Sequence, residues 1–155
     1  GIVMISITQL LAGVLTGSAK ANASQMVKEN GQFAISTIEH SLRNAASVAV
    51  CSSDLQYSVV DKSIGVTVTT LYQYDLFSTP IRLRQTQTID AGAPVTSFLT
   101  NADLNVDAFS CTAFPGSPGQ PPVYKISLTL SKPSSLVEQS IVQQTFETTV
   151  SLRTY

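Results

Sequence analysis

The side chains that most often carry out catalysis are few in this chain and stand apart from one another. His40 is the single histidine, with Glu39 beside it and Arg43 three residues later. A catalytic triad or acid–base pair needs its members within hydrogen-bond reach, whereas adjacent helical residues point in different directions. We therefore expect a solvated histidine next to a Glu39–Arg43 pair on one helix face.

A second set of polar residues alternates along a short segment: Asn101, Asp103, Asn105 and Asp107. Oxygen-bearing side chains at alternate positions superficially resemble a calcium-binding loop, but the glycine of the sharp turn and the closing glutamate are missing. The sequence also contains no phosphate-binding loop or nucleophile elbow. We therefore predict that the chain is not an enzyme, and that it has no catalytic residue, cofactor or metal.

The composition argues against nucleic acid as a partner. Charged residues make up 12% of the chain and the formal net charge is −1, so no basic surface is expected. A low charge together with abundant Ser and Thr is typical of an exported protein, whose surface is solvated by hydroxyl and amide groups.

The two cysteines, Cys51 and Cys111, belong to no Cys-x-x-Cys or Cys/His cluster, which argues against zinc. In an oxidising compartment they would pair, and closing so long a loop stabilises a protein by roughly 4 kcal/mol in the chain-entropy model. Two buried free thiols are the alternative. We predict the disulfide because the chain has the composition of an exported protein.

One long helix is predicted from Ile2 to about Val48, because this stretch has no proline and many helix formers. Residues 1–19 carry no charge and are apolar on all faces, as in a helix within lipid or within a bundle. The aliphatic residues that we predict to form a membrane and assembly surface are Ile2, Val3, Ile5, Ile7, Leu10, Leu11, Val14 and Leu15.

Small residues recur at every fourth position of this region, at Gly13, Gly17 and Ala21. Such a ridge lets neighbouring helices approach closely; the alternative is that two glycines only loosen the helix. The apolar segment is shorter than the roughly 20 residues of a membrane span. We therefore expect that part of it precedes Gly1 in the complete protein.

Beyond Lys20 the apolar positions narrow to one stripe, with spacings of three, four and seven residues, which marks a single buried face. We predict that Ile35, Ile38 and Leu42 dock the helix on a globular head. A helix of this length exceeds the diameter of such a head. Part of it must therefore protrude, and a protruding apolar helix needs a partner.

After Cys51 the hydrophobic period changes to two and β-branched residues dominate, which predicts strands. A Pro/Gly-rich segment, Phe114–Pro122, is expected to be an exposed loop. The predicted strands are Leu55–Asp61, Gly65–Tyr74, Pro80–Ile89, Val95–Leu99, Leu104–Ala113, Val123–Ser131 and Val142–Arg153.

The predicted fold class is α+β, a long N-terminal helix whose C-terminal half packs on a mainly antiparallel β-sheet head. The predicted domains are a helix over residues 1–50 and a β-rich globular head over residues 51–155. Within the helix, residues 1–19 would serve the membrane and assembly, and residues 20–50 would pack on the head.

Residues 24–45, SQMVKENGQFAISTIEHSLRNA, resemble the first helix of type IV pilin-like proteins. They look closest to minor pilins and pseudopilins, which follow their membrane segment with the pattern E-N-G-x-x-A-x-x-x-I-x-x-x-L-R-N-A. Residues 144–153 are similar to the last strand of such proteins, and residues 123–131 to the strand before it. The sequence departs from the family because no acidic residue precedes Glu29, and Ser6 stands where the assembly glutamate would fall if Gly1 ended the leader.

The resemblance implies a pilin-like fold and a structural role in a type IV pilus-like filament. The subunit would wait in the inner membrane and then pack helix to helix, with its own copies or other pilins, into a filament at the cell surface. One alternative is a pseudopilin of a type II secretion or competence machine. Another is a membrane-anchored adhesin or binding module that uses residues 114–122 and the Tyr72–Phe77 hairpin.

Overall fold

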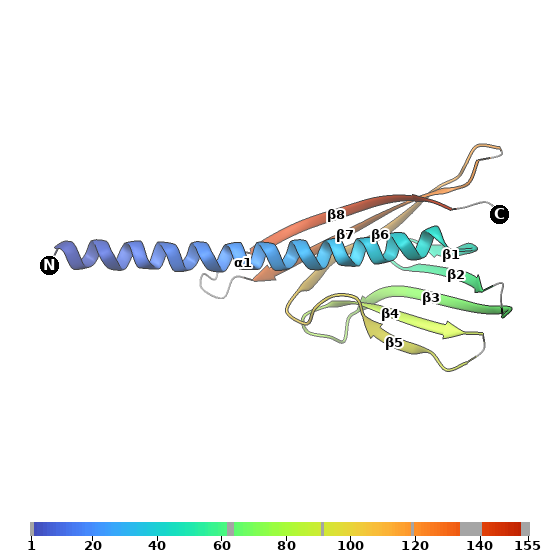
Figure 1. Cartoon of the computed structure of the whole chain (residues 1–155), viewed down its shortest axis with the longest axis horizontal. Coiled ribbons are helices and arrows are strands. Elements are labelled where there is room, and N and C mark those ends of the chain that lie inside the picture. Colours follow the sequence, from blue (N-terminus) through green and yellow to red (C-terminus); the bar gives the residue numbers. More distant parts are fainter. Residues whose placement is uncertain (1, 62–63, 91, 119, 134–140, 153–155) are drawn as a thin grey trace.

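The computed structural model describes residues 2–61, 64–90, 92–118, 120–133 and 141–152, with backbone alone for residues 2–13, 16 and 133. One helix, α1 (Ile2–Arg43), precedes the strands of the described chain (Figure 1). The strands are β1 (Ser47–Cys51), β2 (Leu55–Asp61), β3 (Val66–Asp75), β4 (Arg82–Ile89), β5 (Val95–Phe98), β6 (Asn105–Phe114), β7 (Val123–Pro133) and β8 (Ile141–Ser151).

The strands form two antiparallel sheets, and within each sheet every strand pairs with the strands next to it along the chain. A five-stranded sheet has the order β1-β2-β3-β4-β5, and a three-stranded sheet has the order β6-β7-β8. The ladders are regular except for register shifts between Val48 and Val50 in β1 and between Val106 and Ala108 in β6. The topology is therefore made of local hairpins throughout.

The predicted fold class is wrong. We expected a long helix on one mainly antiparallel sheet head, whereas the chain is mostly β and its strands are divided between two separate sheets. Alternating hydrophobicity identifies strands but does not specify which of them share a sheet. The division falls between β5 and β6, where residues 99–104 carry the chain from one sheet to the other (Figure 1).

The helix also ends earlier than predicted. The backbone N–H groups of Asn44 and Ala45 donate to the carbonyl groups of Ser41 and Leu42, three residues back, which tightens the last turn. The following segment, Ser47–Cys51, is β1 and pairs with β2. Small and β-branched residues of this kind can occur in a helix or in a strand. The pairing of this segment with β2 therefore determines that it is a strand. The seven predicted strands coincide with β2 to β8 except at their ends.

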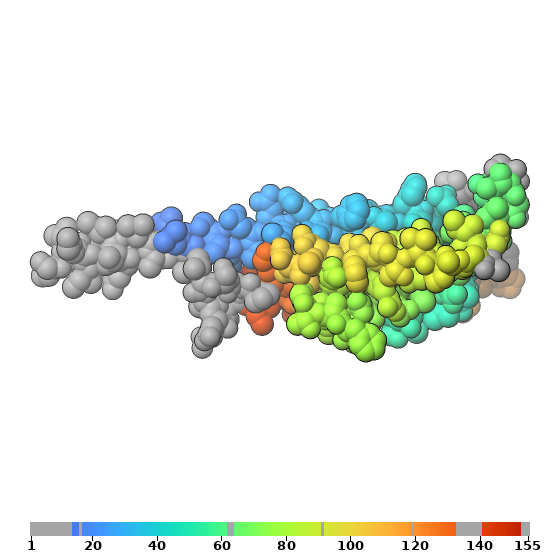
Figure 2. Space-filling model, turned by 90° about the horizontal axis from the view of Figure 1, so that it is seen from below, coloured from blue at the N-terminus to red at the C-terminus, as the bar shows by residue number. Residues whose placement is uncertain are grey.

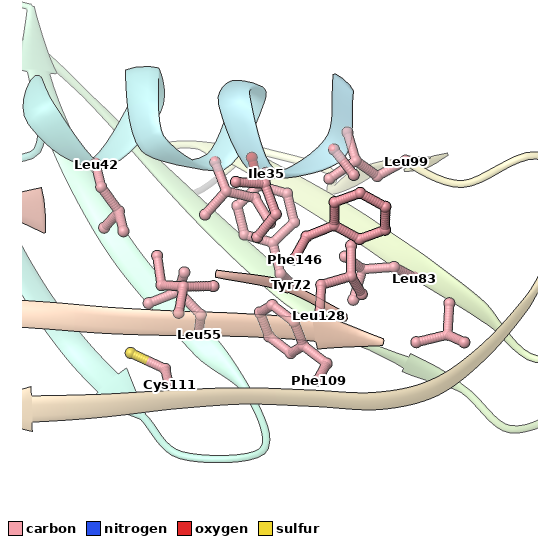
Figure 3. Packing of buried hydrophobic residues seen from close by; sticks show 14 of the residues in the cluster. Ile35, Leu42, Leu55, Tyr72, Leu83, Leu99, Phe109, Cys111, Leu128 and Phe146 are labelled. Atoms are coloured by element: carbon pink, nitrogen blue, oxygen red, sulfur yellow. The ribbon is translucent and has the colours of Figure 1, made fainter. Parts of the chain in front are cut away.

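A single hydrophobic core joins the helix to both sheets. Figure 3 shows Ile35 and Leu42 of α1 above Tyr72 and Leu83 of the five-stranded sheet and Leu128 of the three-stranded sheet. Fully buried residues of the core include Val27, Ile38, Leu42, Leu55, Tyr72, Leu83, Leu104, Ile126, Leu128 and Leu130. Neither sheet could bury its inner face without the helix.

The helix makes its closest strand contacts with β8 and β7, the last two strands of the chain. Gly31 permits the close approach to β8, because a Cβ at this position would overlap the ring of Phe146. The two partners are buried together, and Phe146 lies below the helix in Figure 3. The small residue is therefore required by packing between elements far apart in the sequence.

Candidate assembly helix and polar groove

The helix consists of two parts with different surroundings. Its buried stripe begins at Ala23 and continues through Val27, Ala34 and Ile38 to Leu42. The backbone of the preceding turns extends beyond the ends of both sheets (Figure 1). We call residues 23–43 the docked segment and residues 2–22 the projecting segment. The whole helix of 42 residues is about 63 Å long at 1.5 Å per residue.

Apolar side chains of the projecting segment face solvent. Val14 is 68% exposed and Leu15 is 55% exposed, and Figure 2 shows the described blue end of the helix protruding past the strands. Gly17 has nothing within 4 Å of a virtual Cβ, and Ala21 is exposed. The remaining predicted assembly residues lie outside the described side chains: Ile2, Val3, Ile5, Ile7, Leu10, Leu11 and Gly13.

Within the described part of the chain, no helix combines the length and the apolar character that a membrane span requires.

The three residues that we expected to dock the helix lie in the hydrophobic core. Ile38 and Leu42 are fully buried and Ile35 is 8% exposed. Each belongs to the cluster that includes residues of both sheets. At 25 cal/mol per Å² of apolar area removed from water, burying each of these side chains stabilises the docked segment by about 2 kcal/mol.

The predicted disulfide is confirmed, and it links the two sheets. Cys51 at the end of β1 is bonded to Cys111 in the middle of β6, with 4.8 Å between their Cα atoms. Beside it, the backbone N–H of Cys111 donates to the carbonyl of Ser52 at 2.6 Å. These contacts hold the five-stranded sheet against the three-stranded sheet.

The expected Glu39–Arg43 ion pair is present on the helix surface. A further partner comes from β8, where the Thr148 hydroxyl donates to Glu39 Oε2 at 2.9 Å. The hydrogen bond from Thr148, followed by that from Arg43, lowers the pKa of the Glu39 carboxyl below its ordinary value. Sequence reasoning missed Thr148, since only the packing of α1 on β8 brings it near.

The alternating Asn and Asp residues do not converge on one point. Asn101 Oδ1 accepts the backbone N–H of Asp103, and Asn105 Oδ1 accepts that of Ile81. Asp107 sits at the register shift of β6 and accepts hydrogen bonds from the side chains of Asn105, Ser131 and Gln143. These residues join β6 to its surroundings. Across the described chain, no group of three or more His, Cys, Asp or Glu side chains could hold a metal ion.

A groove lies between the end of α1 and the inner face of β2, β3 and β4. Its volume is about 340 Å³, within the range of small-molecule sites. The helix packs closely on β7 and β8, and the groove occupies the flank that it turns toward the other sheet. It is lined by His40, Ser41 and Asn44 of the helix and by Tyr57, Val59, Asp61, Val68, Thr70 and Gln87 of the strands.

The hydroxyl group of Tyr57, which lines the groove, lies next to that of the fully buried Tyr72. The Tyr57 and Tyr72 oxygens are 3.4 Å apart. Burial, followed by the proximity of Tyr57, raises the pKa of Tyr72 far above its ordinary value. Tyr72 therefore stays neutral at physiological pH.

Other polar groups around the groove retain hydrogen-bonding capacity. Within the described residues, the side chains of His40, Thr70 and Gln87 make no hydrogen bond, and Asn44 donates its amide to the His40 carbonyl. The strand register aligns Tyr57 with Thr70 and Thr70 with Gln87. The alignment of Tyr57, Thr70 and Gln87 across the sheet was not predicted from the sequence, because it depends on the register of three strands. The polar residues at inward positions of β3 and β4 were the available signal.

No protein-family model, curated protein or solved structure matches this chain.

Proposed function

We propose that this chain is a structural subunit of a type IV pilus-like filament, assembled through the projecting segment of α1. The observation that carries the proposal is the exposure of Val14 and Leu15 on a helix that continues past the strands covering its other half. Aliphatic surface left in water is unfavourable by about 25 cal/mol per Å². In a filament, the projecting segments of neighbouring subunits would pack against one another and bury the apolar surface that the subunit's own strands leave exposed.

The small residues favour contact between helices rather than with the head. Gly17 has open space around it, and Ala21 is exposed one turn later. Positions without large side chains let two helix backbones approach closely and gain van der Waals contact. Before assembly, the same apolar segment would be accommodated by the inner membrane.

The disulfide supports an extracellular head. Such bonds form and persist in oxidising compartments and are rare in the cytosol. The Cys51–Cys111 bond connects the two sheets and would therefore protect the head in a surface filament. The subunit would reach that position when its helix leaves the membrane for the filament.

The proposal is tested by a matched pair of valine variants, Val14→Glu and Val95→Glu. These valines are 68% and 66% exposed, the first on the projecting segment and the second on β5. Negative-stain microscopy of shear fractions from the source cells should show filaments containing the wild-type chain and Val95→Glu, but none containing Val14→Glu. Filaments formed equally well by Val14→Glu would refute assembly through this segment.

Deletion of residues 1–19 supplies a second measurement. The truncated chain should remain folded and monomeric by size-exclusion chromatography with light scattering, because the docked segment retains its core contacts. A truncated chain that still polymerised would place the assembly surface on the sheets instead.

One observation favours a surface adhesin or binding module as the second candidate. Phe77 in the β3–β4 turn is 98% exposed, next to exposed Leu76, although Tyr72 of the same predicted contact surface is fully buried. Exposed large apolar side chains next to each other favour an interaction site at this turn. A chain recovered only as dispersed membrane protein, whose attachment to a surface is lost with Phe77→Ser, would support this role over filament assembly.

A further inference from the structure

We propose that the outer face of the five-stranded sheet binds an acidic polysaccharide, a sugar chain that carries carboxylate groups. The binding residues are Arg82, Arg84 and Phe98, which we call the arginine site. This inference concerns recognition by the head and depends neither on filament assembly nor on the groove beside the helix. It rests on the position of the two arginines, on their missing ion pairs and on the neutral polar groups around them.

The two arginines point away from the core from the same strand. In β4 they alternate with Leu83, which is fully buried in the hydrophobic core (Figure 3). Because successive side chains of a strand point to opposite faces, Arg82 and Arg84 share the outer face, about 7 Å apart along the strand. From β2 to β5, the side chains of this face are all half-buried or exposed. The outer face is therefore open to a ligand.

The strand register adds an aromatic ring to the two cations. Arg84 is opposite Phe98 in the β4–β5 ladder. The guanidinium carbon of Arg82 lies 3.5 Å from the centre of the same Phe98 ring. Stacking on an aromatic face holds a guanidinium group in place, while the N–H donors at its edge remain available. Phe98 therefore orients Arg82 before any ligand binds.

Neither arginine forms an ion pair with the described residues. Both ion pairs of this part of the chain involve other cations. Asp75 is opposite Arg82 in the β3–β4 ladder, but no ion pair joins the two, and Asp75 Oδ1 accepts the backbone N–H of Phe77. Arg84 Nε is buried without a hydrogen-bond partner among the described residues. An unpaired buried donor is unfavourable, and rotation of Arg84 onto a ligand carboxylate would satisfy it.

The surrounding polar groups match the hydroxyl groups of a sugar. Gln73 is opposite Arg84, and Thr86 is opposite Thr96 on the same face of the sheet. Across the described part of the chain, these three side chains have no hydrogen-bond partner. A hydroxyl group and an amide can each donate and accept hydrogen bonds. An acidic sugar chain would therefore place carboxylates on the arginines and hydroxyl groups on this neutral surround.

Other large anions fit the outer face less well. Proteins that bind nucleic acid or anionic lipid through charge contact it with many lysines and arginines. The outer face of β2 to β5 has two, and the net charge of the chain is −1. A nucleic acid base would also have to compete with Arg82 for the Phe98 ring. These features favour recognition of a few carboxylates on a polar chain.

Binding is measured with a matched pair of sugar chains. The full chain, in a non-ionic detergent whose head group contains no sugar, would be titrated by calorimetry with an oligogalacturonate. The control is the methyl ester of the same oligosaccharide, in which the carboxylates are neutral. We expect saturable binding of the acid, which weakens as sodium chloride is added, and no binding of the ester.

Variants of the charged residues locate the ligand. Arg82→Gln and Arg84→Gln should each weaken binding about tenfold, since each removes a charged hydrogen bond. Arg43→Gln removes the same charge from an ion pair on the helix and should bind like the wild type. Asp75→Asn should tighten binding about twofold, because it removes a negative charge opposite Arg82. Unchanged circular dichroism spectra would show that the variants are folded.

Three results would overturn the proposal. One is the absence of binding, or equal binding of the acid and its ester. Another is an equal loss for Arg43→Gln and Arg84→Gln, which would indicate unspecific attraction. The third is tighter Arg84-dependent binding of single-stranded DNA or of phosphatidylglycerol vesicles than of the oligogalacturonate. Because filament formation plays no part in this titration, failure here and failure of the assembly proposal would be separate results.

Discussion

The docked and projecting segments of α1 belong to one continuous helix, yet only the docked segment is covered by the strands of this chain. The docked segment is amphipathic, with a narrow buried stripe that includes Val27, Ile38 and Leu42. The projecting segment is the more apolar of the two in sequence, although Val14 and Leu15 are exposed. Apolar residues of the helix therefore lie in the core only where other elements of the same chain pack against them.

Removal of the disulfide should have the largest effect on the docked region. The double variant Cys51→Ser/Cys111→Ser loses the link between the sheets that the docked segment covers. For a loop of this length, the chain-entropy model gives a loss of about 4 kcal/mol in the free energy of unfolding. Urea unfolding followed by circular dichroism measures it, with reduced wild type as the control. An unchanged unfolding midpoint would contradict the proposed role of the link.

A pair of leucine variants compares the two segments directly. Leu42→Ala should lower the free energy of unfolding by about 3 kcal/mol, because it leaves a cavity in the core. Leu15→Ala removes an exposed side chain and should change the free energy of unfolding by less than about 0.5 kcal/mol in the monomeric protein. Equal losses in urea unfolding would show that the projecting segment packs against the rest of the same chain.

A pair of glycine variants sharpens the same comparison. Gly31→Ala places a methyl group against the Phe146 ring and should destabilise the protein by about 1 to 3 kcal/mol. Gly17→Ala meets open space and should stabilise the helix by up to about 1 kcal/mol. Thermal unfolding should therefore shift in opposite directions. A lower melting temperature for Gly17→Ala would indicate a close neighbour at that position.

Acidification should give the smallest effect. The pKa of Glu39 is lower in the folded protein than in the unfolded chain, so the carboxylate stabilises the fold at neutral pH. This stabilisation is lost as the pH falls below the ordinary carboxyl pKa and through the lowered value. Exposure and screening limit it to about 0.5 kcal/mol.

The variant Thr148→Val tests this assignment. It removes the first cause of the pKa shift, so its unfolding midpoint should depend less on pH between pH 7 and pH 3 than that of the wild type. The neighbouring exchange Thr149→Val, on the other face of β8, is the control. Identical pH profiles for Thr148→Val and wild type would show that Thr148 does not stabilise the carboxylate.

Local patterns in the sequence predicted local structure well, and long-range arrangement poorly. Alternation located the strands from Leu55 onward, and composition predicted the Cys51–Cys111 bond, because both signals depend on residue type alone. The division into two sheets and the strand Ser47–Cys51 were missed, since they depend on which segments pair.

The candidate site, too, was predicted from the sequence only in part. The helix positions Ile35, Ile38 and Leu42 could be selected by their spacing. The groove could not, because Thr70 and Gln87 become neighbours only through the register of β3 and β4, and Ser41 reaches them only through the packing of the helix. The sequence shows polar residues at inward-facing strand positions, but it does not show which residues lie opposite them.

The order in which the helix and its covering strands leave the ribosome has a kinetic consequence. Each sheet is a succession of adjacent hairpins, which can close as soon as they are synthesised. The helix α1, in contrast, is covered mainly by β7 and β8, and β7 begins at Val123, 80 residues after α1 ends at Arg43. Contacts so distant along the chain form late because of the entropy of closing the intervening loop. During translation the stripe around Ile38 therefore stays uncovered the longest, and a chaperone or bilayer that shields the nascent helix would act in that interval.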